Sequence, residues 1–341
     1  MNDFKKIINK RNEIVPQMID YDKVGDRYVP YVMRFDKPHR NFKSVSTDEY
    51  GFRQTVKKNK DVLTFDEFKN LDLQKGVIIG GSTVFGVGAT NDCFTIPSYL
   101  NKMTSTYWYN FGARAYNSTQ ELLLFLLHAP ETVKNVVLFS GINNVILAYI
   151  SKSTSPIYNS LFYQSQYEAK FENLNPLGIK ETSSNLLRAI KSKLISKKIH
   201  TAGKALNKDL NHQKYNDMIN CFKRDIQILK SFCNGNNTNL FFAMQPLATW
   251  INKNLSQEER ELFKILDNDG GWPVLADNLN TVKNKYFTDI ENICSDLKVN
   301  YYNLNQDKSF VEKHWLFVDR VHLTDLGYDL SAKILKREFG L

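Results

Sequence analysis

Short apolar runs and longer amphipathic stretches alternate along the chain. Each short run is rich in β-branched or aromatic residues and ends at a glycine or a polar residue, which is typical of a strand buried on both faces of a sheet. The longer stretches place apolar residues three and four positions apart, as one face of a helix requires. This alternation predicts a parallel sheet with helices on both faces. The predicted strands cover residues 75–81, 106–112, 135–140, 239–244 and 299–304.

The predicted helices lie between these strands and after the last one. One of them begins at Ser118, which we interpret as its N-cap because Glu121 follows three residues later. His128 lies near its end, and we interpret it as a helix-terminal histidine rather than a ligand because cations are favoured there. The other predicted helices cover residues 91–102, 215–233, 278–297 and 324–339, with a further helical stretch from residue 256.

Two parts of the chain depart from this alternation. Residues 1–70 are polar and aromatic with weak periodicity, and we expect them to pack on a main domain formed by residues 71–341. Residues 150–215 are predicted to be a helical insertion in that domain. The segment 188–208 contains seven lysines and arginines and no acidic residue, so it accounts for most of the formal charge of +9.

This basic segment permits two interpretations. The first is the solvated face of a helical insertion, because lysines alternate with apolar residues at helical spacing. The second is an amphipathic surface that is attracted to anionic lipid or to an acidic polymer. The sequence favours the first interpretation without excluding the second.

Composition excludes several classes of protein. The hydrophobic content of 42% and the charged content of 24% are typical of a folded globular chain. The four cysteines form no Cys-x-x-Cys pair and have no histidine clustered near them, which argues against a zinc site and fits reduced thiols in a cytosol. Apart from the basic segment the chain is close to neutral, so we expect no specific nucleic-acid partner.

We expect a cytoplasmic protein. The first residues contain no apolar segment of the kind found in a secretory signal, and no run of about 18 apolar residues exists. Attachment to the inner face of a membrane through residues 188–208 is a second hypothesis for its location. The sequence does not specify an oligomeric state.

The stretch Gly76–Gly88 contains most of the first predicted strand and the glycine-rich turn that follows it. It places Ser82 after a buried strand, where open α/β sheets bind their ligands. Its spacing excludes a Walker loop, because Val87 follows Gly86 where a lysine is needed. It also excludes the Gly-x-Ser-x-Gly elbow, because Val84 stands in place of the second glycine. A Gly-Ser turn without chemistry is the alternative.

Polar groups that suit acyl transfer follow several of the predicted strands. Ser82 needs a base to become a nucleophile, and His322 is the residue type whose pKa lies near neutrality. Asp319 lies three residues before His322 and is an acceptor for the second ring nitrogen. The backbone amides of Ser82 and Gly112 and the side-chain amide of Asn143 are the expected donors to an oxyanion. Each group alone is weak evidence, but their order along the chain makes the set specific.

At these positions the sequence resembles the SGNH, or GDSL-like, hydrolase family. Its four blocks are similar to residues 80–83, 110–112, 141–144 and 319–322. The resemblance implies a flavodoxin-like three-layer α/β/α sandwich with about five parallel strands. It also implies the same nucleophile, acid–base pair and donors, and no metal or organic cofactor. Two positions depart from the family pattern, because Gly81 and Asn144 stand where aspartates are usual.

The resemblance implies a serine-dependent acyl-ester hydrolase, a deacetylase or esterase. The Gly-Phe-Arg at 51–53, together with the Gly-Gly-Ser-Thr and Asp-x-x-His blocks, is similar to members associated with bacterial surface-polysaccharide biosynthesis, which implies an acylated sugar or glycan as substrate. A sugar O-acyltransferase using the same site is the first alternative. A non-catalytic glycan-binding module is the second, and a membrane- or polyanion-docking protein is compatible with either enzyme.

Overall fold

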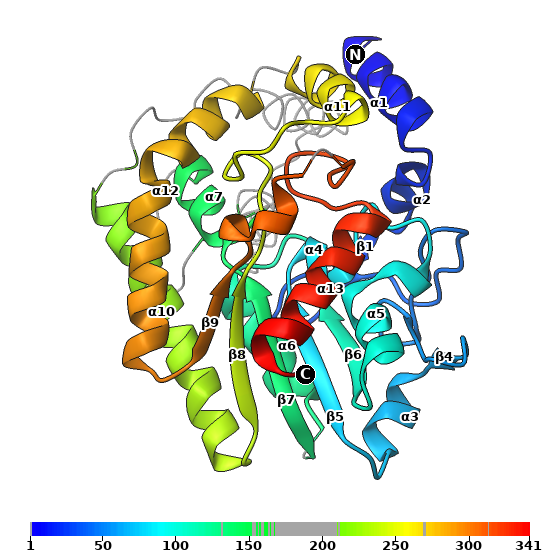
Figure 1. The fold of residues 1–341 in the computed structure, drawn as a ribbon, viewed down its shortest axis with the longest axis vertical. Coiled ribbons are helices and arrows are strands. Elements are labelled where there is room, and N and C mark those ends of the chain that lie inside the picture. The colour runs from blue at the N-terminus through cyan, green and yellow to red at the C-terminus, as the bar shows by residue number, and fades with distance from the viewer. Residues whose placement is uncertain are drawn as a thin grey trace, which may run out of the picture.

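The computed structural model describes residues 2–130, 132–151, 155, 157, 160–162, 164, 167, 210, 212–268, 271–312 and 314–341. Its centre is a five-stranded sheet in which neighbouring strands are parallel (Figure 1). Most of the predicted insertion, including the whole basic segment 188–208, lies outside the described residues.

The strand order confirms the predicted fold class. The sheet runs β6-β5-β7-β8-β9, so β5, the first strand of this sheet in chain order, has the second on one side and the later three on the other. This is the doubly wound order of flavodoxin-like proteins, with a topological switch point beside the first strand. The strands are β5 (Lys75–Gly80), β6 (Tyr107–Gly112), β7 (Val133–Ser140), β8 (Asn239–Met244) and β9 (Asn300–Asn303).

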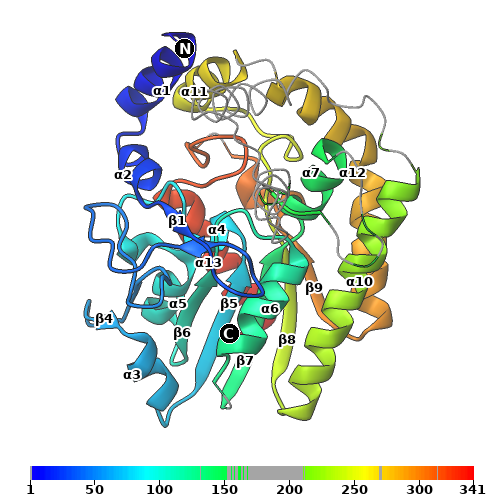
Figure 2. The same ribbon diagram turned by 180° about the vertical axis from the view of Figure 1, so that it is seen from behind.

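Helices cover both faces of the sheet and form two hydrophobic cores (Figures 1 and 2). Successive side chains of a strand point to opposite faces, and β5 follows this rule: Val77 and Ile79 belong to one core and Ile78 to the other. The first core is covered by α6 (Ser118–His128), α7 (Ile142–Ile150), α10 (His212–Gly235) and α12 (Gly271–Asp296). The second is covered by α5 (Ile96–Met103), α11 (Gln257–Asp267) and α13 (Asp325–Phe339).

The start of α6 differs from the prediction by one residue. Its N-cap is Asn117, whose side chain accepts a hydrogen bond from the amide of Gln120, and the Gln120 side chain completes the capping box. Ser118 is the first helical residue rather than the cap. Glu121 is thereby released from a capping role and is buried. His128 is the last residue of the helix, as predicted.

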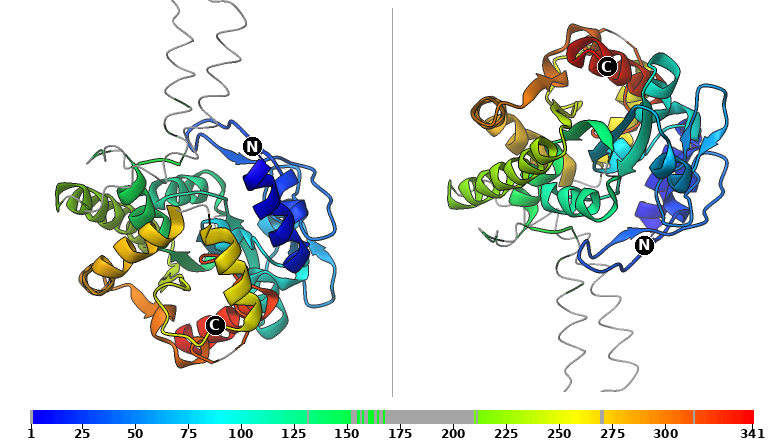
Figure 3. Two further views of the ribbon diagram at one scale, coloured as in Figure 1. Left: turned by 90° about the horizontal axis from the view of Figure 1, so that it is seen from above. Right: turned by 90° about the horizontal axis from the view of Figure 1, so that it is seen from below.

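The region before β5 lies along the β6 side of the sheet (Figures 1 and 3). It contacts the open edge of β6, because the amide of Asn110 donates to Thr55 Oγ1 at 3.3 Å. The placement of a domain boundary at residue 70 stays a prediction. The region contains α1 (Asn2–Ile14), α2 (Met18–Lys23), β1 (Asp26–Arg27), β2 (Phe35–Asp36), β3 (Thr55–Val56), β4 (Val62–Leu63) and α3 (Phe65–Asn70).

Candidate active site

The loops that follow β5, β6 and β7 leave the sheet at the carboxyl ends of these strands and meet near Ser82. The register pairs Gly80 with Gly112 on one side and with Phe139 on the other, so β5, β6 and β7 end together. Ser82 lies two residues beyond the end of β5 and is the first residue of the short helix α4 (Ser82–Phe85). Parallel strands therefore place the predicted site residues at the carboxyl ends of the strands, where α/β sheets bind ligands.

Ser82, His322 and Asp319 form a continuous chain of hydrogen bonds. Ser82 Oγ lies 2.7 Å from His322 Nε2, and His322 Nδ1 lies 2.7 Å from Asp319 Oδ2. The carboxylate can only accept, so Nδ1 carries the ring proton and Nε2 is left as an acceptor for the serine hydroxyl. The three side chains are partly exposed, so a reactant can reach them. Residues 240 positions apart in the sequence thus have the geometry of a nucleophile, its base and the group that orients the base.

The loop that contains His322 is closed by backbone hydrogen bonds. The amide of Val318 donates to the His322 carbonyl at 2.9 Å, and Phe317 forms an antiparallel bridge with Leu323. Asp319 Oδ1 accepts hydrogen bonds from the amides of Val321 and His322, at 2.8 and 2.7 Å. The carboxylate is thereby oriented by its own loop before it contacts the imidazole.

These contacts keep Asp319 ionised. Burial opposes its negative charge, but the charge interaction with His322 and the hydrogen bonds from His322 and from two amides outweigh it and lower the pKa of Asp319. An ionised Asp319 stabilises the imidazolium that forms when His322 takes a proton.

Asn143 lies beside Gly81, the residue before Ser82. It is the second residue of α7, which begins after Gly141 in the left-handed conformation. Its Nδ2 donates to the Tyr116 carbonyl at 2.7 Å, which uses one of its two N–H groups, and the described residues offer no acceptor for the other. A Cβ atom on Gly81 would lie only 2.7 Å from Asn143 Nδ2, so the glycine allows the amide to approach the backbone beside the serine.

The neighbouring Asn144 joins the two helices that flank the site. Its Oδ1 accepts from the amide of Ser118 at 3.0 Å and its Nδ2 donates to Ser118 Oγ at 2.8 Å. The Ser118 hydroxyl in turn donates to Asp225 at 2.7 Å. The side chain of Asn144 is fully buried, so this asparagine fixes the start of α7 against the start of α6.

The structure does not support Gly112 as an oxyanion donor. Its amide donates to Asn110 Oδ1 at 2.8 Å, whereas the next amide, that of Ala113, donates to the Gly80 carbonyl of β5 at 3.0 Å. Successive amides of a strand point to opposite sides, so the Gly112 amide is directed to the open edge of the sheet and away from β5. Gly112 is instead needed for packing, because a Cβ there would lie 2.1 Å from the amide nitrogen of Phe85.

The loop after β6 contains a residue that the sequence did not point to. Ala115 has a φ of +62°, which is unusual for a residue with a side chain. It precedes Tyr116, whose carbonyl binds Asn143, so the loop passes beside the predicted donor. Within the part of the chain that the structure describes, no acceptor is found for the amide of Ala115. A glycine, an asparagine or an aspartate at this position would have signalled the conformation in the sequence, but an alanine does not.

Glu121 is a second residue near the site, although the sequence assigned it to the cap of α6. It is fully buried, and Ser140 Oγ, at the end of β7, lies 2.6 Å from its Oε2. Its Oε1 lies 3.8 Å from the position that a Cβ on Gly81 would occupy, so the carboxyl group approaches the backbone before Ser82. Burial raises the pKa of Glu121 to about 8, although the Ser140 hydroxyl opposes the shift.

Among the described residues, no group of three or more histidine, cysteine or acidic side chains has the arrangement of a metal site. All four cysteines lie within the described ranges, and none of them forms a disulfide bond there. No helix in the described ranges is long and apolar enough to cross a membrane.

Comparison with known proteins gives distant structural similarity only. No family model matches the sequence, and no curated protein matches it. The acetyl xylan esterase AlAXEase is 12% identical over 77% of this chain and 98% of its own, with a TM-score of 0.39. Axe2, an acetylxylan esterase from Geobacillus stearothermophilus, is 12% identical over 79% and 94%, with a TM-score of 0.39. A GDSL-like lipase from Bacteroides thetaiotaomicron VPI-5482 is 15% identical over 79% and 89%, with a TM-score of 0.38. Similarity of this degree does not assign a function, which must come from the site itself.

Proposed function

We propose that this chain is a serine-dependent acyl-ester hydrolase that reacts through an acyl-Ser82 intermediate. The observation that supports this most directly is the chain of two 2.7 Å hydrogen bonds that joins Ser82 to His322 and His322 to Asp319. A binding module has no need for a serine hydroxyl aligned with an oriented imidazole. The arrangement is the one that turns a weak hydroxyl nucleophile into a reactive one.

The reaction follows from the positions of the three side chains. Ser82 Oγ attacks the ester carbonyl carbon while its proton passes to His322 Nε2, and Asp319 stabilises the resulting imidazolium. When the tetrahedral intermediate collapses, the C–O bond to the leaving alcohol breaks and His322 returns the proton to the alkoxide oxygen. Water then attacks the acyl-serine with His322 again as the base, which releases the acid and restores Ser82.

The oxyanion is stabilised by three N–H donors. Two of these donors are the amide of Ser82, at the start of α4, and the N–H of Asn143 Nδ2 that has no acceptor among the described residues. We assign the third donor to the amide of Ala115 in place of Gly112. The unusual φ of Ala115 and the absence of an acceptor for its amide among the described residues support this assignment.

The substrate class rests on the resemblance of the sequence blocks. It favours a small acyl ester, such as an acetyl group, on a carbohydrate hydroxyl. If a second sugar hydroxyl replaces water in the last step, the same site is an O-acyltransferase. The two activities differ only in the acceptor that reaches the acyl-serine.

Hydrolysis of p-nitrophenyl acetate tests the function. The wild-type protein is expected to hydrolyse the ester, and Ser82→Ala is expected to fall to the uncatalysed background. Ser231→Ala is the control, because this serine lies exposed on α10 and its hydroxyl donates to the Gln227 carbonyl of its own helix. Equal rates for wild type and Ser82→Ala would contradict the proposal.

The same assay separates hydrolysis from transfer. With an oligosaccharide added as acceptor, a hydrolase releases one acetate for each nitrophenol. A transferase releases less acetate than nitrophenol, and mass spectrometry finds the missing acetyl groups on the oligosaccharide.

A further inference from the structure

The helix that begins with Ser82 is too short to be stable by itself. It contains four residues, Ser82–Phe85, and is therefore about 6 Å long. Nucleation of so short a helix is unfavourable, and its last carbonyls have no partners within the helix. The position of Ser82 therefore depends on groups that bind the other end of α4 and the loop that follows it.

Those groups are side chains from distant parts of the sequence. Every carbonyl from Phe85 to Ala89 lies within hydrogen-bond distance of a side-chain donor. Arg53 reaches Phe85 and Gly86 at 3.3 and 3.0 Å, Tyr21 reaches Gly86 and Ala89 at 2.7 and 2.8 Å, Gln17 reaches Gly88 at 2.9 Å and Tyr328 reaches Val87 at 2.7 Å. Three of these four side chains come from the region before β5.

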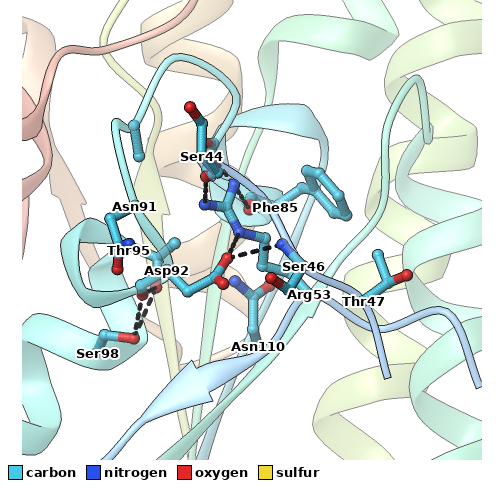
Figure 4. Close-up of polar contacts among 12 residues, drawn as sticks. Ser44, Ser46, Thr47, Arg53, Phe85, Asn91, Asp92, Thr95, Ser98 and Asn110 are labelled. Carbon is cyan, nitrogen blue, oxygen red and sulfur yellow. Dashed lines mark hydrogen bonds and ion pairs between the residues drawn. The ribbon is translucent and has the colours of Figure 1, made fainter. Parts of the chain in front are cut away.

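Arg53 is the centre of this arrangement (Figure 4). Its side chain is fully buried, and its Nη2 donates to the Ser44 carbonyl at 2.7 Å while Nη1 contacts Tyr21 Oη at 2.6 Å. Its guanidinium group also lies 5.6 Å from the centre of the Phe85 ring. One planar group thus connects the Ser44 backbone, Tyr21 and the last turn of α4.

Asp92 fixes the orientation of the guanidinium. Its Oδ1 accepts from Arg53 Nε at 2.7 Å and from the amide of Ser46 at 3.1 Å. This places the ion pair on the Nε side and leaves both terminal nitrogens for backbone carbonyls (Figure 4). A buried arginine is stable only when its charge and its donors are satisfied, and here Asp92 and the carbonyls satisfy them.

We propose that Arg53 is a positioning residue for Ser82: by binding the carbonyls of Phe85 and Gly86 it fixes α4, and so sets the distance between Ser82 Oγ and His322 Nε2. This inference rests on the proposed function, because it gives Arg53 a role in the reactivity of Ser82. It assigns part of the catalytic geometry to the region before β5, which contributes no residue to the Ser82–His322–Asp319 chain.

The geometry of the guanidinium explains why an arginine is present. Its donors are fixed in one plane, so it can bind Asp92, Ser44 and the end of α4 at the same time. A lysine has a single point of charge and cannot reach all three. We therefore expect reactivity to decrease from wild type to Arg53→Lys and further to Arg53→Met.

The rate at which a fluorophosphonate modifies Ser82 measures this role directly. Arg53→Lys is expected to lower the second-order rate constant about 10- to 100-fold, since a displacement of about 1 Å can reduce a rate by about two orders of magnitude. With p-nitrophenyl acetate the loss is expected in kcat, with KM little changed. All rates are measured at a temperature where circular dichroism shows each variant to be folded.

Arg11→Lys is the matched control. Arg11 is also a buried arginine of the same region and pairs with Asp22, but in the described part of the chain its side-chain hydrogen bonds go only to Asn12 and Asp22. Its phosphonylation rate is expected to stay within twofold of wild type. A lower thermal midpoint for Arg53→Lys with an unchanged phosphonylation rate would show a purely structural role and overturn the inference.

Two further outcomes are decisive. If Arg53→Lys does not fold, Tyr21→Phe removes a hydroxyl from the same arrangement, and an unchanged Ser82 reactivity in that variant would overturn the inference. If wild-type Ser82 does not react with the phosphonate while Arg11→Lys and wild type are both folded, the proposed function fails, and the role of Arg53 fails with it.

Discussion

Two carboxyl groups lie near Ser82, one joined to it through His322 and one beside Gly81, and their environments drive their pKa values apart. Asp319 contacts His322 and accepts hydrogen bonds from two backbone amides, and its pKa is lowered. Glu121 is fully buried with one hydroxyl, that of Ser140, as its partner, and its pKa is raised to about 8. Near neutral pH the first is a carboxylate and the second is mostly a neutral acid.

The difference shows that proximity to a nucleophile does not by itself make a carboxyl group part of the catalytic set. Asp319 is ionised where a positive charge develops on His322. Glu121 is neutral on the side of Gly81 and Asn143, where an ionised group would repel the developing oxyanion. The same residue class thus has two different roles, which are set by the donors around each group.

Replacement of Asp319 is expected to give the largest effect. Asp319→Asn keeps the size of the side chain but favours the wrong tautomer of His322, and kcat is expected to fall by about 10³- to 10⁴-fold. Glu121→Gln is the matched control and is expected to change kcat by less than tenfold. A similar loss in both variants, measured with p-nitrophenyl acetate, would remove the contrast between the two carboxyl groups.

Asn143→Ala tests the donor on the Glu121 side of Ser82. The variant lacks one oxyanion donor, so kcat is expected to fall by about 10²- to 10³-fold with little change in KM. Gly112→Ser is not a suitable control, because any Cβ there would meet Phe85. Asn239→Ala, on the exposed end of β8, is the control whose rate is expected to match wild type.

Gly81→Ala tests the same side with a smaller change. The new methyl group would lie 2.7 Å from Asn143 Nδ2, so the amide must move away from the oxyanion position. We expect kcat to fall about tenfold, since a donor that is displaced still contributes more than one that is removed. Activity equal to wild type would mean that the position of the Asn143 amide has no bearing on the rate.

The pH dependence of stability distinguishes the two carboxyl groups without an assay of activity. Glu121 binds a proton in the folded state up to about pH 8, whereas in the unfolded chain it ionises near 4.5. The wild-type protein is therefore expected to lose free energy of unfolding as pH rises from about 4.5 to about 8, by at most about 1.4 kcal/mol per pH unit from this group.

Glu121→Gln is expected to lack that contribution, so the difference between its stability and that of wild type grows with pH across this window and is constant above it. Asp319 has the opposite sign: its contribution is present above the ordinary pKa of 3.8 and is lost as pH falls through its lower folded value. Denaturant unfolding of wild type, Glu121→Gln and Asp319→Asn from pH 3 to pH 9 measures how the stability contribution of each carboxyl group changes with pH. A parallel dependence for wild type and Glu121→Gln would show that Glu121 ionises normally in the folded state.

The sequence was most informative where local pattern determines structure. β5 and β7 contain the apolar runs 77–79 and 136–139, and Ser82 and Asn143 follow the ends of these strands within three residues. His322 and Asp319 lie just before α13, the helix that the sequence predicts over 324–339 and that begins at Asp325 in the structure. Once the strands are known to be parallel, these residues are expected together at the carboxyl ends of the strands.

The remaining features depend on contacts between distant residues. The direction of the Gly112 amide depends on which side of β6 faces β5, and the sequence does not show this. Glu121 was assigned to a cap because the true cap, Asn117, lies one residue earlier. The conformation of Ala115 and the burial of Arg53 arise from tertiary packing alone.

The most direct test of the central claim is to trap the covalent intermediate. Wild-type protein is mixed with p-nitrophenyl acetate, quenched in acid within the first turnover and digested for mass spectrometry. We expect one acetyl group, on Ser82, in wild type and none on that peptide in His322→Ala. Rapid hydrolysis with Ser82 unmodified, or an acetyl group on another residue that forms as fast as the burst of nitrophenol, would contradict it.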